Sequence, residues 1–236
     1  MRTCEPSTAR NAIRKRIAAL FVPVACLLCA VSIAYAADIS SVTFTLDFPN
    51  SSPEHYAIML QSNGQAHYES SGRISNDSDA RDDYQTDFTF SETTRNQIFK
   101  LAKDAHYFSG KIDSGSKKVA FTGAKKLAYS DGQRASSAEY NFSTVAPVQQ
   151  LTALFQNISA TMEFGRRLTY YHRYQKLALD EELRRMEDEA RRGDLAELQA
   201  VNPILQQIYD DNSVMSVVRA RAERIMELGK TVSAAR

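Results

Sequence analysis

Residues 41–48 (SVTFTLDF) and 56–70 (YAIMLQSNGQAHYES) alternate between apolar and polar side chains. A period of two residues is typical of a β-strand that buries one of its faces. In the first run Val42, Phe44 and Leu46 share one side, and the polar Thr43, Thr45 and Asp47 share the other. These two stretches therefore predict strands of an antiparallel sheet with one buried face.

The turn inside the second stretch fixes how its two strands pair. A two-residue turn at Asn63-Gly64 would set apolar side chains against polar ones. A three-residue turn over residues 62–64 instead pairs Leu60 with Ala66 and Ile58 with Tyr68, which keeps the apolar side chains on one face. We therefore predict the three-residue turn, with Gly64 in the left-handed conformation.

Further strands and one helix are expected before residue 143. Residues 71–83 carry almost no apolar side chains and predict an exposed loop. A strand over 84–90 follows, and Ser91 then predicts the N-cap of a helix that ends near Gly110. Three more runs with strand character lie at 119–122, 126–130 and 138–142.

After Pro147 the apolar period changes to 3.6 residues and stays there. Val148, Leu151, Phe155, Ile158 and Met162 form one stripe, which predicts a helix lying on the sheet. We expect a break at Gly165, a charged helix over 166–192 ended by Gly193, and shorter helices over 194–210 and 214–228, with Pro203 dividing the first.

The predicted fold class is α+β. An antiparallel sheet of about seven strands is packed by two helices and followed by an all-helical C-terminal extension. The expected division is a signal peptide over 1–36, an α+β domain over 38–162 and the helical extension over 163–236.

The first 36 residues follow the pattern of an export signal. Basic residues 14–16 precede an apolar run over 17–34, and Ala34-Tyr35-Ala36 matches a signal-peptidase site. We expect the mature chain to begin at Ala37 and to lie in the periplasm or outside the cell. Alternatively, the uncharged run 17–36 is retained as a membrane anchor, which also places the rest of the chain outside the cytoplasm.

Cysteine and charge exclude several classes of function for the expected mature chain. Cys4, Cys26 and Cys29 all lie in the segment that is expected to be removed. Disulfides, thiolate catalysis and cysteine-bound metals are therefore not expected. The remaining chain has 24 basic and 27 acidic side chains, a net charge of −3. This balance predicts no nucleic-acid partner, and a membrane partner is expected only if the signal segment is retained.

Two segments resemble known kinds of protein. Tyr56-Ala-Ile58, Gly64 and Tyr68, followed by the polar loop and the helix over 92–108, resemble uncharacterised exported bacterial proteins with a small antiparallel-sheet domain. This resemblance covers about residues 40–160 and implies fold and compartment, without an activity. A second run lies near the C-terminus and comprises Pro203-Ile204-Leu205, Ile208, Asp211, Val214, Val218-Arg219 and Ala222. It is similar to a single HEAT unit, in which two antiparallel helices meet at an acidic turn.

No residue pattern indicates a catalytic, cofactor or metal site. His55, His67, His106 and His172 are too far apart in sequence for a helix to present two as neighbouring metal ligands, and each is expected at the surface. No Gly-x-Ser-x-Gly motif occurs. Four aspartates, Asp77, Asp79, Asp82 and Asp83, crowd the polar loop, but their spacing is not that of an EF-hand, so a solvated loop is preferred to a calcium site.

The best interaction signal is an aromatic cluster in the helical extension. Tyr170, Tyr171 and Tyr174 spread over more than one helix face, so part of the cluster can pack inward with Phe164 and Leu168. Tyr170 and Tyr174 are then available to another chain. Alternatively, the whole cluster packs into the hydrophobic core.

The leading prediction is an exported, non-enzymatic binding or scaffolding protein that uses the helical extension as its contact surface. The competing class is a secreted hydrolase whose dispersed active site leaves no motif in the sequence. A third possibility is that the extension docks on the sheet and completes the core.

Overall fold

The computed structural model describes residues 39–73, 81–116 and 118–234. The expected signal peptide lies outside these residues, as do Asp77 and Asp79.

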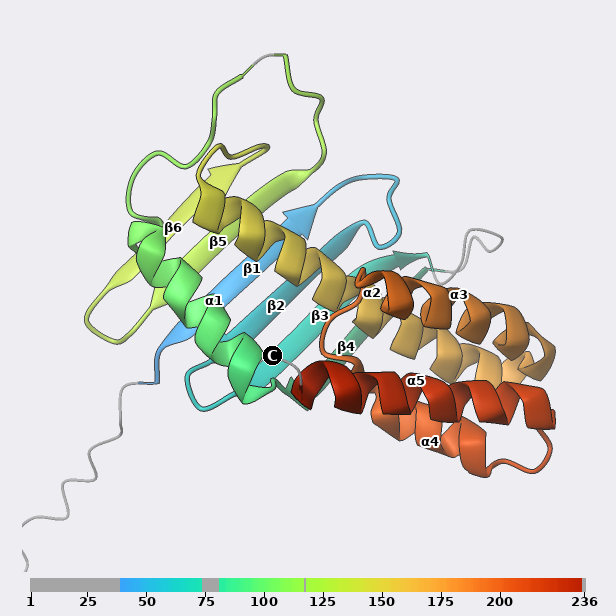
Figure 1. Cartoon of the computed structure of the whole chain (residues 1–236). Helices are drawn as coiled ribbons and strands as arrows, with labels where there is room; N and C mark the ends of the chain where they lie inside the picture. Colours follow the sequence, from blue (N-terminus) through green and yellow to red (C-terminus); the bar gives the residue numbers. More distant parts are fainter. Residues whose placement is uncertain (1–38, 74–80, 117, 235–236) are drawn as a thin grey trace, which may run out of the picture. The chain divides into compact units, whose positions relative to one another are not determined.

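Six strands form one antiparallel sheet in the order β4-β3-β2-β1-β5-β6 (Figure 1). The expected pairing is confirmed, because Leu60 lies opposite Ala66 and Ile58 opposite Tyr68, with Gly64 at a φ of 91°. The strands are β1 (Ser41–Asp47), β2 (His55–Gln61), β3 (Gln65–Arg73), β4 (Arg81–Thr89), β5 (Ala124–Ser130) and β6 (Ala135–Tyr140).

The described residues contain six strands, whereas the sequence predicts about seven. Residues 119–122 do not form a strand. A side chain takes the place of a neighbouring strand there: Asn141 Nδ2 donates to the carbonyl of Ala120 at 3.0 Å, and Asn141 Oδ1 accepts from the Thr122 N–H at 2.9 Å. The strand propensity of this run is overridden by a local hydrogen-bond arrangement.

The prediction of a loop over residues 71–83 is wrong at both ends. Residues 71–73 continue β3, and residues 81–83 begin β4, with Ser71 opposite Asp83 and Gly72 opposite Asp82. Strand pairing uses backbone groups, so exposed polar side chains at the sheet edge do not prevent it. Of the four aspartates, Asp82 and Asp83 therefore lie on a strand.

The α-helices of the described residues are α1 (Glu92–Asp104), α2 (Ala146–Tyr174), α3 (Leu179–Arg192), α4 (Asn202–Asp210) and α5 (Ser216–Ala234). The predicted N-cap is confirmed, because the Ser91 hydroxyl accepts from the N–H of Thr94 at 3.3 Å. Gly193, at a φ of 82°, ends α3 as expected. The α1 helix stops at Asp104 and not near Gly110.

The expected break at Gly165 is wrong, since α2 continues through it. A Cβ atom on Gly165 would lie 2.6 Å from Cγ1 of Val201. The glycine therefore permits the chain before α4 to approach α2 closely, and the helix tolerates it.

Helix α2 crosses the sheet from one edge to the other, and α1 lies beside it (Figure 1). The hydroxyls of Thr152 and Tyr140 of β6 are 2.7 Å apart, and the ring of Phe155 stacks on Phe44 of β1 at 5.2 Å. Near the opposite edge Arg166 donates to the Asp82 carbonyl of β4 at 2.8 Å. On β1, β2 and β3 the alternate side chains, which point to the other face of the sheet, are partly or fully exposed.

The helical part and the sheet share one continuous apolar core. Leu168 of α2, Leu183 of α3, Leu205 of α4 and Val218 of α5 are all fully buried in the same cluster as the strand residues. The expected boundary at residue 162 falls inside α2. The division into an α+β domain over 38–162 and a helical extension over 163–236 remains a prediction.

Candidate functional site

The C-terminal end of α2, the turn into α3 and the turn between α4 and α5 lie at the same end of the helical part (Figure 1). Asp211 joins them: its Oδ2 is 2.9 Å from Nε2 of His172 and 2.6 Å from Nζ of Lys176. These contacts hold the pKa of Asp211 well below its usual range, chiefly through Lys176 and Ser213. We refer to residues 170–177 and 211–217 as the tip.

Exposed apolar side chains are concentrated at the tip. Tyr174 is 62% exposed, Leu177 84%, Met215 49% and Val217 53%. These are four of the eight large hydrophobic side chains that are exposed in the described residues. Large contiguous apolar patches are typical of surfaces that another molecule covers.

The two tyrosines expected to meet a partner lie together at the tip. The rings of Tyr170 and Tyr174 are 5.2 Å apart, and Tyr170 also contacts Tyr171 edge-on at 5.8 Å. The guanidinium of Arg173 lies 5.3 Å from the centre of the Tyr174 ring. Tyr170 is half-buried and Tyr174 exposed, so both aromatic and cationic groups face outward here.

Three of the four histidines pair with an aspartate. His55 Nδ1 lies 2.6 Å from Asp47, and His67 Nδ1 lies 2.7 Å from Asp87; the third pair is His172 with Asp211. His106 is exposed after α1. Within the described residues no group of three or more side chains is arranged to hold a metal ion.

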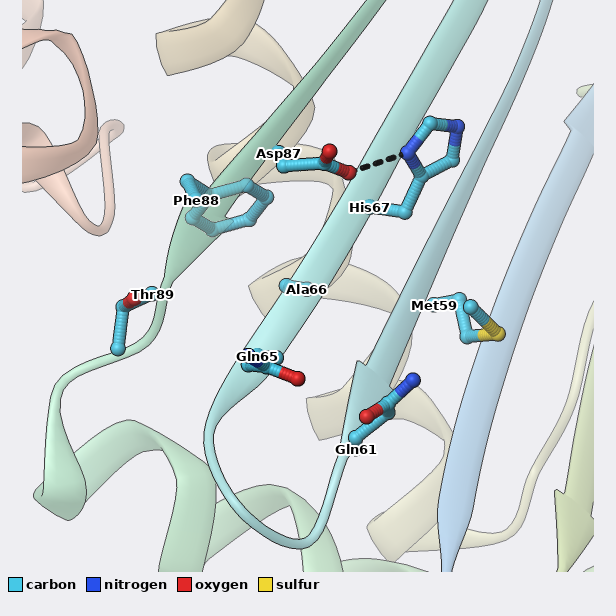
Figure 2. A pocket seen from close by; sticks show the side chains of 8 residues that line it. All are labelled: Met59, Gln61, Gln65, Ala66, His67, Asp87, Phe88 and Thr89. Atoms are coloured by element: carbon cyan, nitrogen blue, oxygen red, sulfur yellow. Dashed lines mark hydrogen bonds and ion pairs between the residues drawn. The ribbon is translucent and has the colours of Figure 1, made fainter.

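A hollow of about 470 Å³ lies on the open face of the sheet at β2, β3 and the end of β4 (Figure 2). The imidazole of His67 points toward Asp87, as a general base held by a carboxylate does. A hydrolase that works through a covalent intermediate also needs a nucleophilic side chain beside that base. The hydroxyl in the lining belongs to Thr89, which lies at the other end of the hollow in Figure 2.

A second cavity, of about 520 Å³, lies between α2, α3 and the loop after β1. Glu163 is buried in its wall and accepts hydrogen bonds from the hydroxyls of Tyr68 at 2.8 Å and Ser70 at 2.6 Å. Arg166 Nη1 lies 3.3 Å from its other oxygen. Burial, and then the Glu163 charge, raise the pKa of Tyr68. This network ties α2 to β3.

No protein-family model and no curated protein matches the chain. The resemblances to exported bacterial proteins and to a HEAT unit therefore remain predictions. Among the residues described, no helix combines the length and the apolar character that a membrane crossing requires.

Proposed function

We propose that this protein is an exported, non-enzymatic binding or scaffolding protein and that the tip is its contact surface for another protein. The observation that supports this is the exposed apolar group at the tip. Tyr174 at the end of α2 and Leu177 in the turn that follows are more exposed than any other large hydrophobic side chain in the described residues.

The composition of the tip matches that of protein interfaces. Their centres are apolar and aromatic, and their rims are polar. Here the apolar side chains are flanked by Arg173, Lys176, Asn212 and Ser213, which are exposed. Asp211 fixes the relative position of the two segments through Lys176 and His172. The surface is therefore held in place before a partner binds, which lowers the entropy cost of association.

A pair of substitutions tests the contact surface. Tyr174→Glu with Leu177→Glu removes the exposed apolar side chains, and Met59→Gln, at a 37% exposed position on the sheet face, is the matched control. A photo-crosslinker at position 217 identifies the bound protein, which is then purified. Loss of a central aromatic side chain typically costs about 2 kcal/mol or more, roughly a 30-fold rise in Kd.

We expect the double variant to weaken the purified complex by at least this factor and the control to leave it unchanged. A complex weakened by Met59→Gln and not by the two tip substitutions would contradict the proposal.

The export part of the proposal is supported by the charge and apolar pattern of residues 1–36. N-terminal sequencing of the protein purified from cell fractions tests it. We expect Ala37 as the first residue, in the periplasmic or extracellular fraction. An intact Met1 on membrane-bound protein would support the retained anchor instead, and an intact chain in the cytoplasm would overturn both.

A further inference from the structure

The cavity between α2 and α3 has walls of both charges. Its α2 wall is formed by residues three or four positions apart, among them Glu163, Arg167 and Tyr171, which therefore share one helix face. Helix α3 contributes Arg185 and Glu189 to the opposite wall. The cavity shares Tyr171 with the tip, but the exposed side chains Tyr174, Leu177, Met215 and Val217 do not line it, so a role for the cavity does not depend on the proposed function.

Arg167 is held in a fixed orientation with part of its guanidinium unused. Its Nε donates to Glu182 at 2.6 Å, and its Cζ lies 4.7 Å from the centre of the buried Phe164 ring. Its two Nη groups have no hydrogen-bond partner within the described residues. A guanidinium held on one edge and one face presents its remaining N–H groups in the geometry that binds a carboxylate.

Arg185 adds a second positive charge at this end of the cavity. Its Cζ lies 5.5 Å from the same Phe164 ring, and its Nη2 lies 3.4 Å from Glu182. Glu182 thus faces two arginines, which leaves one positive charge in excess among these three side chains. An anionic group is favoured here.

Glu189 of α3 places a negative charge in the same cavity, away from the two arginines. It is half-buried and forms no ion pair within the described part of the chain. It stands four residues after Arg185, so the two positions are separated by about 6 Å along the helix axis. Arg192 interacts with Glu189 electrostatically but donates its hydrogen bond to Asp194, so the Glu189 carboxylate favours a further cation at this end.

We infer that this cavity binds a small zwitterion whose carboxylate meets Arg167 and Arg185, the two arginines at Glu182, and whose ammonium group meets Glu189. An anion alone would lie close to Glu189 and Glu163, and a cation alone would lie close to the two arginines. Charges about 6 Å apart occur in a dipeptide, between its termini, and in a diamino acid such as lysine, between its carboxylate and side-chain ammonium. The cavity volume of about 520 Å³ is within the range of small-molecule sites.

Isothermal titration calorimetry with defined probes tests this inference on the mature protein. The probes are alanyl-alanine, its N-acetyl derivative, its C-terminal amide and free lysine. We expect saturable binding of alanyl-alanine or lysine, and at least tenfold weaker binding of both blocked dipeptides. Preference between the two zwitterions identifies the source of the ligand. Absence of saturable binding by either, or equal binding of the blocked peptides, overturns the inference.

Substitutions assign each charge to its partner. Glu189→Gln should weaken the binding of alanyl-alanine at least tenfold. It should leave the weak binding of the N-acetyl derivative unchanged, because that derivative has no ammonium group. Arg167→Lys keeps the positive charge but loses the paired N–H donors of the guanidinium. It should weaken the binding of alanyl-alanine and leave the binding of its C-terminal amide unchanged. Glu181→Gln, on the exposed face of α3, is the matched control and should change nothing. Equal losses with free and blocked peptides would show that the residues act only through the fold.

Discussion

Substituting Gly165 by alanine tests how the helical part is joined to α2. The new Cβ would lie 2.6 Å from Cγ1 of Val201 and 3.3 Å from its Cβ. Real Cβ atoms essentially never approach another heavy atom within 3.0 Å, so α2 and the segment before α4 must move apart. Both residues are buried, which leaves no solvent-exposed route for the side chains to separate.

Two effects of opposite sign determine the expected change in stability. Replacing glycine by alanine inside a helix stabilises it by about 1 kcal/mol. Overpacking a close contact in the core costs about 1–3 kcal/mol. The single substitution should therefore destabilise the protein by about 0–2 kcal/mol. In a Val201→Ala background the 2.6 Å contact is absent, so Gly165→Ala should stabilise by up to about 1 kcal/mol.

Urea unfolding of the four members of this cycle measures the coupling. We expect a coupling free energy of about 1–3 kcal/mol with unchanged m-values. Gly229→Ala is a useful comparison, because its Cβ would meet Leu198 at 3.3 Å, which a small shift can relieve. An effect of Gly165→Ala that is equal in both backgrounds would refute the close contact between α2 and Val201.

Three further measurements test other parts of the structure. Asp211→Asn should destabilise the protein at neutral pH, and its effect should shrink as pH falls below about 4, because a lowered carboxylate pKa stabilises the fold only where the unfolded group would be ionised. Burial raises the pKa of Tyr140 to about 12, so the stability that comes from its neutral form is present below pH 10 and is lost as pH rises toward 12. In thermal unfolding, Tyr140→Phe should therefore lose less stability between pH 10 and pH 12 than the unchanged protein does. Ser91→Ala should cost about 1–2 kcal/mol in urea unfolding, because the hydroxyl both caps α1 and donates to Glu197 at 2.7 Å.

The regular parts of the fold are predictable because their signals are local. Alternation over residues 41–48 and the apolar stripe of Val148 to Met162 each result from one side of an element being buried, and the hairpin register results from keeping Ile58 and Tyr68 on the same face. Gly193 ends α3 for a reason that is equally local, its left-handed φ.

The failures have long-range causes. Residues 119–122 have strand propensity, but their hydrogen bonds go to Asn141, about 20 positions away, and no local pattern reveals that. A glycine inside a helical run predicts a break, but Gly165 serves the close approach of Val201, which is distant in sequence. His67 and Asp87 are brought together only by the pairing of β3 with β4.

One signal in the sequence does point to the polar cavity and the buried network. Glu163 and Arg166 lie one and four positions after Met162, the last residue of the apolar stripe, and both are nearly fully buried. Charged side chains that continue a buried helix face must find partners there, since an unpaired buried charge is costly. The sequence could therefore have indicated a paired carboxylate and guanidinium at this point, although not that Tyr68 and Ser70 complete the network.

The length of α2 relative to the sheet explains why an exposed tip exists. The helix has 29 residues and is about 44 Å long, whereas six strands span only about 24 Å. Within the described residues its last hydrogen bond to the sheet is made by Arg166, so about two turns extend beyond the edge at β4. Helices α3, α4 and α5 cover that overhang and bury Leu168, but Tyr174 at its end remains exposed. The exposure of the tip therefore results from the length of α2 relative to the width of the sheet.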